Sequence, residues 1–433
     1  PDWNISRNRY WGSPVPVWEC ECGERFVPGS IKDLEEASGE KIVDLHKPGI
    51  DNVFINCKKC GKKAKRTPEV LDSWIEAGSA SFAERHFPFA RDAQGEPEKL
   101  EDFYPPDFIT EYTGQIRAWF YVLHVIGAAI YDSPAFKNVL VSGVILGTDG
   151  RKMSKNFQNY PDPKLMLEKF GGDALRLYLV GSPVMRGEDI LISEEAYKSQ
   201  VRGILLILWN AYKYFVMNAQ QAKMEVISDV KFTSNNVLDK WVMALLQDLV
   251  TKTTNSFESY DSVSTVQQYY DFIQDVSTWY IRRSRDRSTE KEFLNTLHLV
   301  LVTLSKLMAP IAPFISEEIY RNLTHKESVH LDDWPVVDSA LVDEKLLERT
   351  EIIRNIVELG HQVRKKNNIK VRQPLNDLYY AAPRFDKSYD PLQFTEILKA
   401  ELNVKNVMYR EMEDQRIPAE LGIFGAAMAN GIS

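Results

Sequence analysis

The chain has 433 residues, of which 44% are hydrophobic and 26% charged, as is ordinary for a soluble globular protein. We find no apolar run long enough to span a bilayer and no cleavable signal, so we expect no membrane partner and a cytoplasmic location. The formal net charge of −8 excludes an overall electrostatic pull toward nucleic acid, and any RNA binding must use local basic patches.

The sequence opens on Pro-Asp-Trp without an initiator Met, and residues 1–19 read as the middle of a domain. We therefore expect a fragment of a longer protein, with two to four domains of its own.

All four cysteines fall within the first 60 residues, in two tight pairs. Cys20 and Cys22 stand in "CECGERF", Cys57 and Cys60 stand in "CKKCGKK", and a Gly follows each pair as in a zinc knuckle. Four thiolates from two such turns can close a tetrahedral site, so we expect structural Zn²⁺ in an insertion over residues 20–65. Disulfides and a degenerate knuckle without metal are the alternatives.

Residues 66–195 have α/β character. A short strand at 107–110, a long helix at 111–132 and a strand at 139–146 predict one strand–helix–strand crossover of a parallel sheet. The last of these, "VLVSGVIL", has the continuous aliphatic residues of a buried strand. The basic loop "GTDGRKMSKNFQNYPDP" follows it at 147–163, where α/β proteins tend to bind ligands, so we predict a phosphate-handling loop. Helices are expected at 163–170 and 172–181.

Long amphipathic helices dominate from residue 196. Apolar stripes at three- and four-residue spacing predict a helical bundle over 196–340, with helices at 201–217, 237–257, 263–283 and 292–310. A polar helix at 344–367 and strand-like pieces at 378–382 and 404–409 predict a small α/β appendix within 341–433.

Three basic patches interrupt this acidic chain, and each is by default a solvated surface. They are "KKCGKKAKR" (58–66), "RRSRDR" (282–287) and "VRKKNNIKVRQ" (363–373).

Several segments together, in the right order, resemble class I aminoacyl-tRNA synthetases. They are "DWNISRNRYWGSPVPVW" (2–18), "VLDSWIEAGSASFA" (70–83), "EYTGQIRAWF" (111–120), "DGRKMSKNFQNYPDP" (149–163), "WYIRRSRDR" (279–287), "LMAPIAPFISEEIYRNL" (307–323) and "IKVRQPL" (369–375). Within the family, "NYPDP", "GSPVMRGEDI" (181–190) and "VHLDDWP" (329–335) resemble the isoleucine-specific branch.

The resemblance covers nearly the whole chain and implies its fold class. We expect the second half of a Rossmann-type α/β catalytic domain in residues 1–19 and 66–195, interrupted by the zinc-knuckle insertion. An α-helical anticodon-binding bundle and the small α/β appendix follow.

The resemblance also implies a reaction: ATP activates L-isoleucine as an adenylate, and the acyl group passes to tRNA(Ile). Lys152 and Lys155 are the implied catalytic cations, since they can close over the ATP phosphates, with Ser154 as a further donor. Mg²⁺ is expected with ATP. The alternative is an exposed basic turn, and Asn156 stands where the family usually has Ser.

Four further residues carry implied binding roles. Glu111 and Gln115 align with residues that hold the adenylate, and Trp74 and Trp119 align with the two walls of the amino-acid pocket. Plain core positions are the alternative for both tryptophans.

The same segment departs from the family pattern. Tyr112 stands where Gly is common, and Gly114 stands where Asp is expected, so one hydrogen-bonding group is missing.

One histidine-containing segment resembles a family motif only superficially. "HVIG" (124–127) resembles the family's HIGH sequence but lacks its second His and lies inside the predicted helix, so we interpret His124 as a core or groove histidine. The true HIGH segment and the editing insertion are expected outside this chain, which alone should have little activity.

The arginine row at 282–287 is expected either to face tRNA phosphates or to cap a helix. We expect a monomer. A valine- or leucine-specific enzyme and a non-catalytic tRNA-binding paralogue are the competing interpretations.

Overall fold

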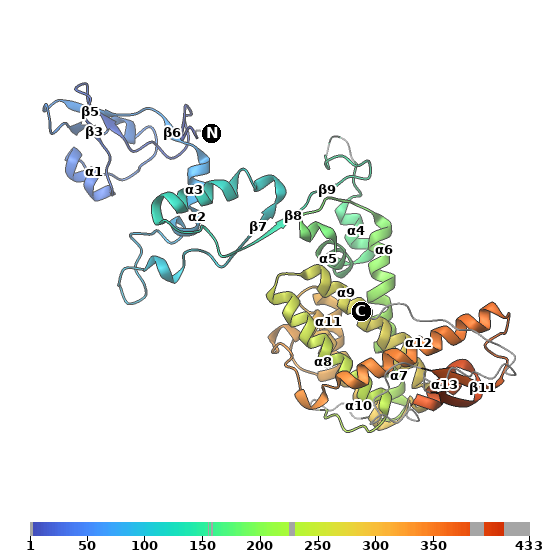
Figure 1. Ribbon diagram of the computed structural model, residues 1–433. Helices are drawn as coiled ribbons and strands as arrows, with labels where there is room; N and C mark the ends of the chain where they lie inside the picture. The colour runs from blue at the N-terminus through green and yellow to red at the C-terminus, as the bar shows by residue number, and fades with distance from the viewer. Residues whose placement is uncertain (1–2, 155, 157–158, 225–229, 382–393, 411–433) are drawn as a thin grey trace. The chain divides into compact units, whose positions relative to one another are not determined.

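The computed structural model describes residues 3–154, 156, 159–224, 230–381 and 394–410 (Figure 1). The chain divides into two compact units. The first is Pro1–Val144 with Arg186–Glu188, and the second is Ile145–Met185 with Asp189–Ser433. Within the described ranges, no helix is both long enough and apolar enough to cross a membrane.

The first unit begins with a small antiparallel sheet around the cysteines (Figure 1). Its four strands stand in the order β3-β2-β5-β4, and helix α1 (Ile31–Ser38) packs near β4. Trp18 is buried in the centre of this module, where its Nε1 donates to the Val53 carbonyl at 2.8 Å. The strands are β2 (Trp18–Glu19), β3 (Arg25–Phe26), β4 (Ile55–Asn56) and β5 (Lys63–Arg66).

Two short strands flank this module in sequence. They are β1 (Ser6–Arg7) and β6 (Val70–Leu71), and they pair antiparallel. Residues far apart in the chain thereby bring the start of helix α2 (Ser73–Ala83) next to the N-terminal segment, where Arg7 pairs with the α2 cap Asp72 at 2.6 Å.

The predicted crossover is confirmed. Strand β7 (Phe108–Tyr112) pairs parallel with β8 (Asn138–Ser142), and helix α3 (Trp119–Tyr131) connects them and packs on α2. The helix was predicted to begin at 111, which is wrong: Thr113–Gln115 form a 3-10 turn, because Thr and Gly are poor helix formers there. His124 is exposed on α3 beside buried Leu123, so it is not a core histidine.

The expected single buried strand at 139–146 is not observed. The chain forms β8 up to Ser142 and a separate strand β9 (Ile145–Leu146) in the second unit, with Gly143 between them. The residues of β8 are exposed or half-buried, so continuous aliphatic character did not mean burial here.

The second unit begins with β9, which pairs parallel with β10 (Ile190–Leu191). Helices α4 (Pro163–Phe170) and α5 (Gly172–Val180) confirm the predicted pair at 163–170 and 172–181. Asp162 caps α4, Pro163 occupies its first turn and Gly171 ends it, so the sequence signals alone locate both ends.

The predicted helical bundle is confirmed. One continuous apolar core joins its helices, with Phe293, Leu297 and Leu301 fully buried along the stripe of α10. Two π-helical turns, Val201–Leu205 and Val276–Ile281, interrupt the predicted helices at 201–217 and 263–283. The helices are α6 (Glu194–Gln200), α7 (Leu206–Gln221), α8 (Val237–Glu258), α9 (Ser262–Asp275), α10 (Lys291–Met308) and α11 (Pro313–Thr324).

Helix α5 is fastened to the bundle by two side chains. Buried Asp173 accepts from the backbone N–H groups of Phe314 (3.2 Å) and Ile315 (2.7 Å) at the start of α11. Arg176 donates to the carbonyls of Ile311 (2.8 Å) and Pro310 (2.9 Å) just before that helix. Burial raises the pKa of Asp173, although the two backbone donors act in the opposite sense.

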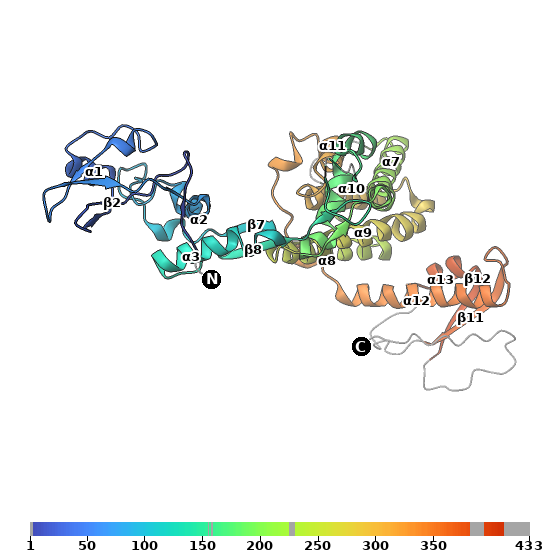
Figure 2. The same cartoon turned by 90° about the horizontal axis from the view of Figure 1, so that it is seen from above.

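The predicted appendix is also present. Helix α12 (Glu344–Lys366) leads to two parallel strands, β11 (Leu375–Ala381) and β12 (Val404–Arg410), with α13 (Thr395–Leu402) packed on β12 and α12 (Figure 2). Arg364 is buried where α12 ends, and its guanidinium donates to the Gln373 carbonyl at 3.0 Å and to that of Leu402.

Candidate functional site

The two cysteine pairs lie in matching turns. In the first, the Gly23 N–H donates to the Cys20 carbonyl and the Cys20 N–H donates to the Glu24 carbonyl, at 2.8 and 2.9 Å. In the second, the Gly61 N–H donates to the Cys57 carbonyl, again at 2.8 Å. Gly23 and Gly61 have φ of 83° and 73°, a region that favours glycine, so each turn depends on the Gly that follows its cysteines.

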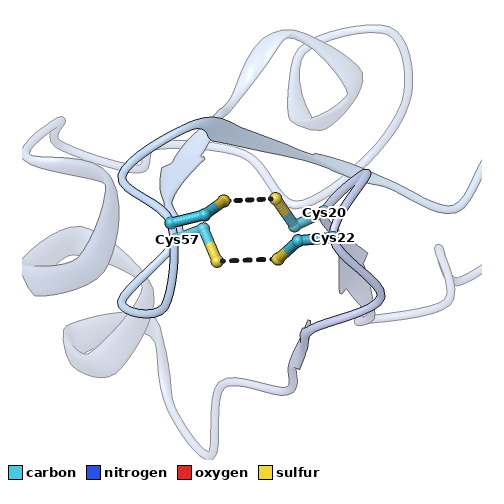
Figure 3. Close-up of side chains that lie close together, drawn as sticks. Cys20, Cys22 and Cys57 are labelled. Carbon is cyan, nitrogen blue, oxygen red and sulfur yellow. Dashed lines mark hydrogen bonds between the residues drawn. The ribbon is translucent and has the colours of Figure 1, made fainter.

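The turns bring all four thiols together, as predicted. Every pair of sulfur atoms lies within 4.8 Å, and Figure 3 shows Cys20 and Cys22 facing Cys57 across the gap between the turns. The Cys20–Cys60 and Cys22–Cys57 sulfurs are 3.4 and 3.6 Å apart. A disulfide bond is about 2.05 Å, so all four cysteines are free and the disulfide alternative is wrong. A tetrahedral site with metal–sulfur bonds of about 2.3 Å has edges of about 3.8 Å, close to these separations.

The thiols differ in acidity. The backbone N–H groups of Cys60 and Lys59 point at the Cys57 sulfur and lower the pKa of Cys57 to about 7, against the effect of burial. The Cys22 N–H favours the Cys20 thiolate, yet burial and the neighbouring thiols outweigh it and raise the pKa of Cys20 to about 12. Neighbouring thiolates repel one another, so the four cysteines do not all ionise easily on their own. A dication bound between them would stabilise the thiolate forms.

The basic loop is organised by Asn159, a residue that the sequence did not single out. Asn159 is buried; its Oδ1 accepts from the Ser154 N–H at 3.0 Å and its Nδ2 donates to Asp149 at 2.8 Å. Its carbonyl also accepts from the Thr148 N–H at 2.8 Å. An Asn before Tyr-Pro is a common turn composition, so the sequence gives no signal of this central position.

The loop also holds a local charge pair. The Asn159 amide donates to Asp149, and the backbone and side chain of Arg151 donate to the same carboxylate, which together lower the pKa of Asp149 to about 2. Asp149 is thus ionised at neutral pH and neutralises Arg151 within the loop.

The candidate phosphate-binding residues follow this turn. Exposed Lys152 has its backbone paired with Leu146 of β9, and the Ser154 hydroxyl accepts from the Asn156 N–H at 3.2 Å. Lys155 lies outside the described residues. Lys152 and Ser154 belong to the second unit, whereas Trp74, Glu111, Gln115 and Trp119 belong to the first.

In the first unit, the implied adenylate residues have local partners. Glu111 is exposed near the end of β7, and its Oε2 accepts from the Tyr112 N–H at 3.1 Å. The Gln115 Oε1 accepts from the Trp119 N–H at 3.2 Å, where α3 begins. The side-chain oxygen of Gln115 therefore already accepts a backbone hydrogen bond, whereas Glu111 is exposed to solvent.

The two implied pocket tryptophans have different surroundings. Trp74 lines a cavity of about 700 Å³, together with the exposed side chain of Arg117 and the ring of Tyr121. Trp119 is half-buried against the β7–α3 core, and its Nε1 donates to the Ala77 carbonyl at 2.9 Å. Trp119 is not among the residues that line this cavity.

The two departures from the family pattern touch each other. The ring of Tyr112 lies so close to Gly114 that a Cβ on residue 114 would stand 2.4 Å from two ring carbons and 2.5 Å from the phenol oxygen. Tyr112 therefore occupies the space that an Asp side chain at 114 would need, and the phenol hydroxyl stands where that side chain would begin. Tyr112 and Gly114 are therefore sterically coupled, because the Tyr112 ring fits only when residue 114 has no side chain.

A groove of about 1330 Å³ lies in the helical unit between α8, α9 and α12. Arg354 forms its floor, with a two-bond pair to Asp275 at 2.6 and 3.0 Å and its guanidinium over the rings of Trp241 and Trp279. Within the described parts of the chain, the buried Trp279 Nε1 and His361 Nδ1 have no hydrogen-bond partner. Such buried groups without a partner cost about 1–3 kcal/mol of stability each.

The lining of this groove is mainly acidic, which disfavours phosphate. Its carboxylates outnumber its cations, and the rings of Trp241 and Trp279 are buried beneath the Arg354 guanidinium. The carboxylates are Asp248, Asp271, Asp275, Glu344, Glu348, Glu351, Glu358 and Glu401, and the cations are Lys252, Arg282, Arg354 and Lys365.

The arginine row at 282–287 is mostly structural. Arg287 is buried and pairs with fully buried Asp239, while Arg282 and Arg283 pair with Glu401 at 2.6 and 3.2 Å. The expectation of phosphate contacts is therefore wrong for Arg287. Arg282 also donates to the Thr278 carbonyl at 2.8 Å, which is the predicted capping contact. The partners Asp239 and Glu401 could not be identified from the sequence, since they lie 48 and 119 positions away.

The comparisons with known proteins agree with this architecture. Residues 1–191 match the family described as tRNA synthetases class I (I, L, M and V), and residues 239–379 match the anticodon-binding domain of tRNA ligase. The chain is 43% identical over 421 residues to the isoleucine–tRNA ligase of Chlamydia trachomatis serovar D and 37% identical over 439 residues to that of Treponema denticola. These alignments cover 94% and 96% of the chain, which spans 40% of the length of either relative.

A solved structure shares the fold. The LeuRS of Agrobacterium radiobacter K84, in a ternary complex with tRNA and LeuAMS, matches 79% of the chain and 43% of its own length, with a TM-score of 0.59 and 21% identity. The α/β crossover, the cysteine module and the helical bundle are thus accounted for together. The chain belongs to the class I tRNA synthetases, and it joins part of their catalytic domain to a helical anticodon-binding domain.

Proposed function

We propose that the protein containing this chain attaches L-isoleucine to tRNA(Ile) through an isoleucyl-adenylate made from ATP. The similarity to isoleucine–tRNA ligases at 43% identity over 94% of the chain carries this proposal. The match of the helical unit to an anticodon-binding domain supports tRNA as the acceptor.

The basic loop is the proposed site of phosphate stabilisation. Negative charge grows on the α-phosphoryl group and the departing pyrophosphate, and Lys152, Ser154 and Lys155 supply cations and a hydroxyl donor toward it. Asn159 and Asp149 hold the turn from which these residues extend. ATP is expected to bring Mg²⁺, which neutralises part of the triphosphate charge, and we assign no residue of this chain to that ion.

The cysteine module is proposed to hold Zn²⁺. Four thiols within 4.8 Å of one another fit a closed tetrahedral site, which leaves no open position for substrate. The ion would cross-link the two turns, and the sheet β3-β2-β5-β4 would depend on it for stability.

The acidic groove is the proposed site for bases of the anticodon region. Its carboxylates would repel a phosphate backbone but can accept hydrogen bonds from base amino groups.

Isoleucine-dependent exchange of pyrophosphate into ATP by the full-length protein tests the proposed reaction. We expect exchange with isoleucine and a loss of about 100-fold or more when Lys152 and Lys155 are both replaced by Ala. Lys164→Ala is the matched control, because Lys164 is exposed on α4 beyond the loop.

Three outcomes would contradict the proposal. Exchange with valine or leucine but not isoleucine would make the protein a differently specific synthetase. Absence of exchange with any amino acid would favour a tRNA-binding paralogue. Full exchange by the double variant would remove the assigned role of the lysines.

A further inference from the structure

The two metal-binding turns carry opposite charge. The first turn is flanked by glutamates, with Glu19, Glu21 and Glu24 around Cys20 and Cys22. Between Asp51 and Glu69 there is no acidic residue at all. That stretch contains the second turn and the basic residues Lys58, Lys59, Lys62, Lys63, Lys65 and Arg66. A chain with a net charge of −8 therefore concentrates positive charge on one β-hairpin.

Three of these basic residues have internal roles. Arg66 is 3% exposed and pairs with Asp51 beneath the sheet. Lys62 pairs with Glu21 of the first turn at 3.1 Å, and the Lys63 ammonium lies 5.5 Å from the centre of the Phe54 ring. These contacts stabilise the module itself.

The other three are available to a partner. Lys58, Lys59 and Lys65 are exposed, and within the described ranges their ammonium groups have no ion pair or hydrogen bond. Strand β5 alternates exposed and buried residues, so Lys63 and Lys65 share its exposed side, and Lys58 and Lys59 stand on the turn that leads into this strand. We call the surface of Lys58, Lys59 and Lys65 the lysine hairpin.

We propose that the lysine hairpin binds the phosphate backbone of tRNA. This inference rests on the proposed function, which supplies tRNA as substrate. Unpartnered ammonium groups on a short rigid hairpin suit a polyanion, since each phosphate contact releases condensed counterions. The first turn has no lysine, and its one arginine, Arg25, is paired with Glu19 at 2.6 Å, so the cations available to the backbone lie on the second turn. Such phosphate contacts would fix the position of the tRNA and would not depend on its base sequence.

A competing role for these lysines lies within the module. Four thiolates around a dication leave a net negative charge, and the nearby ammonium groups could balance it. The experiment therefore measures metal content beside RNA binding.

The test uses the full-length protein with Lys58, Lys59 and Lys65 all replaced by Ala. The matched control replaces Lys32, Lys41 and Lys99, which are exposed lysines of the same unit outside the hairpin. We expect the slope of log Kd for tRNA(Ile) against log salt concentration to fall by about 2–3 in the hairpin variant. Isoleucine-dependent exchange, zinc content and the control variant should remain as in the unmodified protein.

An unchanged salt slope in the hairpin variant would overturn this inference alone, because tRNA binding itself would persist. Loss of zinc would also overturn it, since the lysines would then serve the metal centre. An unmodified protein that bound no tRNA(Ile) would remove the proposed function together with this inference.

Discussion

Asn159 makes the loop around Lys152 a defined structure. Its amide and carbonyl bind both arms of the turn, through the Ser154 and Thr148 N–H groups and the Asp149 carboxylate. Lys152 identifies the loop in the sequence, whereas the buried Asn159 amide holds the Ser154 N–H and the Asp149 carboxylate in place. A cluster of charged residues can be recognised in the sequence. A buried hydrogen-bonding residue such as Asn159 cannot, because its partners are known only from the folded structure.

Replacing Asn159 with Ala should reduce kcat/KM for ATP in the exchange reaction by about tenfold or more. The variant leaves the Ser154 N–H and Asp149 without their buried partner, at a cost of about 1–3 kcal/mol. Asn156→Ser is the control and should stay near the unmodified rate, because the Asn156 side chain is exposed. Equal kcat/KM values for Asn159→Ala and the unmodified protein would contradict this account.

Tyr112 and Gly114 should behave as a coupled pair. Gly114→Asp alone should lower the free energy of unfolding by about 1–2 kcal/mol, because the Tyr112 ring must leave its place. Adding Tyr112→Gly should recover most of that loss, and a double-mutant cycle by chemical denaturation measures the coupling. Gly49→Asp is a suitable control, since a Cβ there would meet only an ordinary contact at 3.6 Å. Strict additivity of the two changes would contradict the pairing.

Among the elements, those with complete local signals were predictable. Helix α4 has an Asp cap, a Pro in its first turn and a Gly at its end, and its bounds match the expectation. Helix α3 was predicted to begin eight residues too early, because its apolar residues continue the pattern of the preceding turn, where Gly114 packs under Tyr112. The ion pairs of the arginine row were not predictable, because each joins elements far apart in the chain.

The cysteine module should depend on its metal as a unit. Cys57→Ser should lower bound zinc from about one equivalent to a small fraction, as removal of one of four ligands opens the site. The module should then become sensitive to proteolysis between Trp18 and Arg66, while far-UV circular dichroism of the helices persists. Lys58→Ser is the control, being adjacent and exposed but not a ligand. Full zinc content in Cys57→Ser would refute the four-thiolate site.

For the molecule as a whole, the order of the parts follows from the sequence, and the residues that line the groove of the helical unit follow only from the structure. The motifs predicted an α/β region, a bundle and an appendix in that order. They did not predict the acidic groove, because its walls come from α8, α9, α12 and α13. The chain spans 40% of the length of the isoleucine–tRNA ligases that it matches.

Asp173 and Arg176 of α5 bind the start of α11 and so connect the helices that follow the basic loop to the bundle. Helix α5 and the start of α11 should move together, because four hydrogen bonds would have to break before either could tilt alone. A tilt of α11 would therefore move α5 with it, and α5 follows directly on α4, the helix that begins where the basic loop ends.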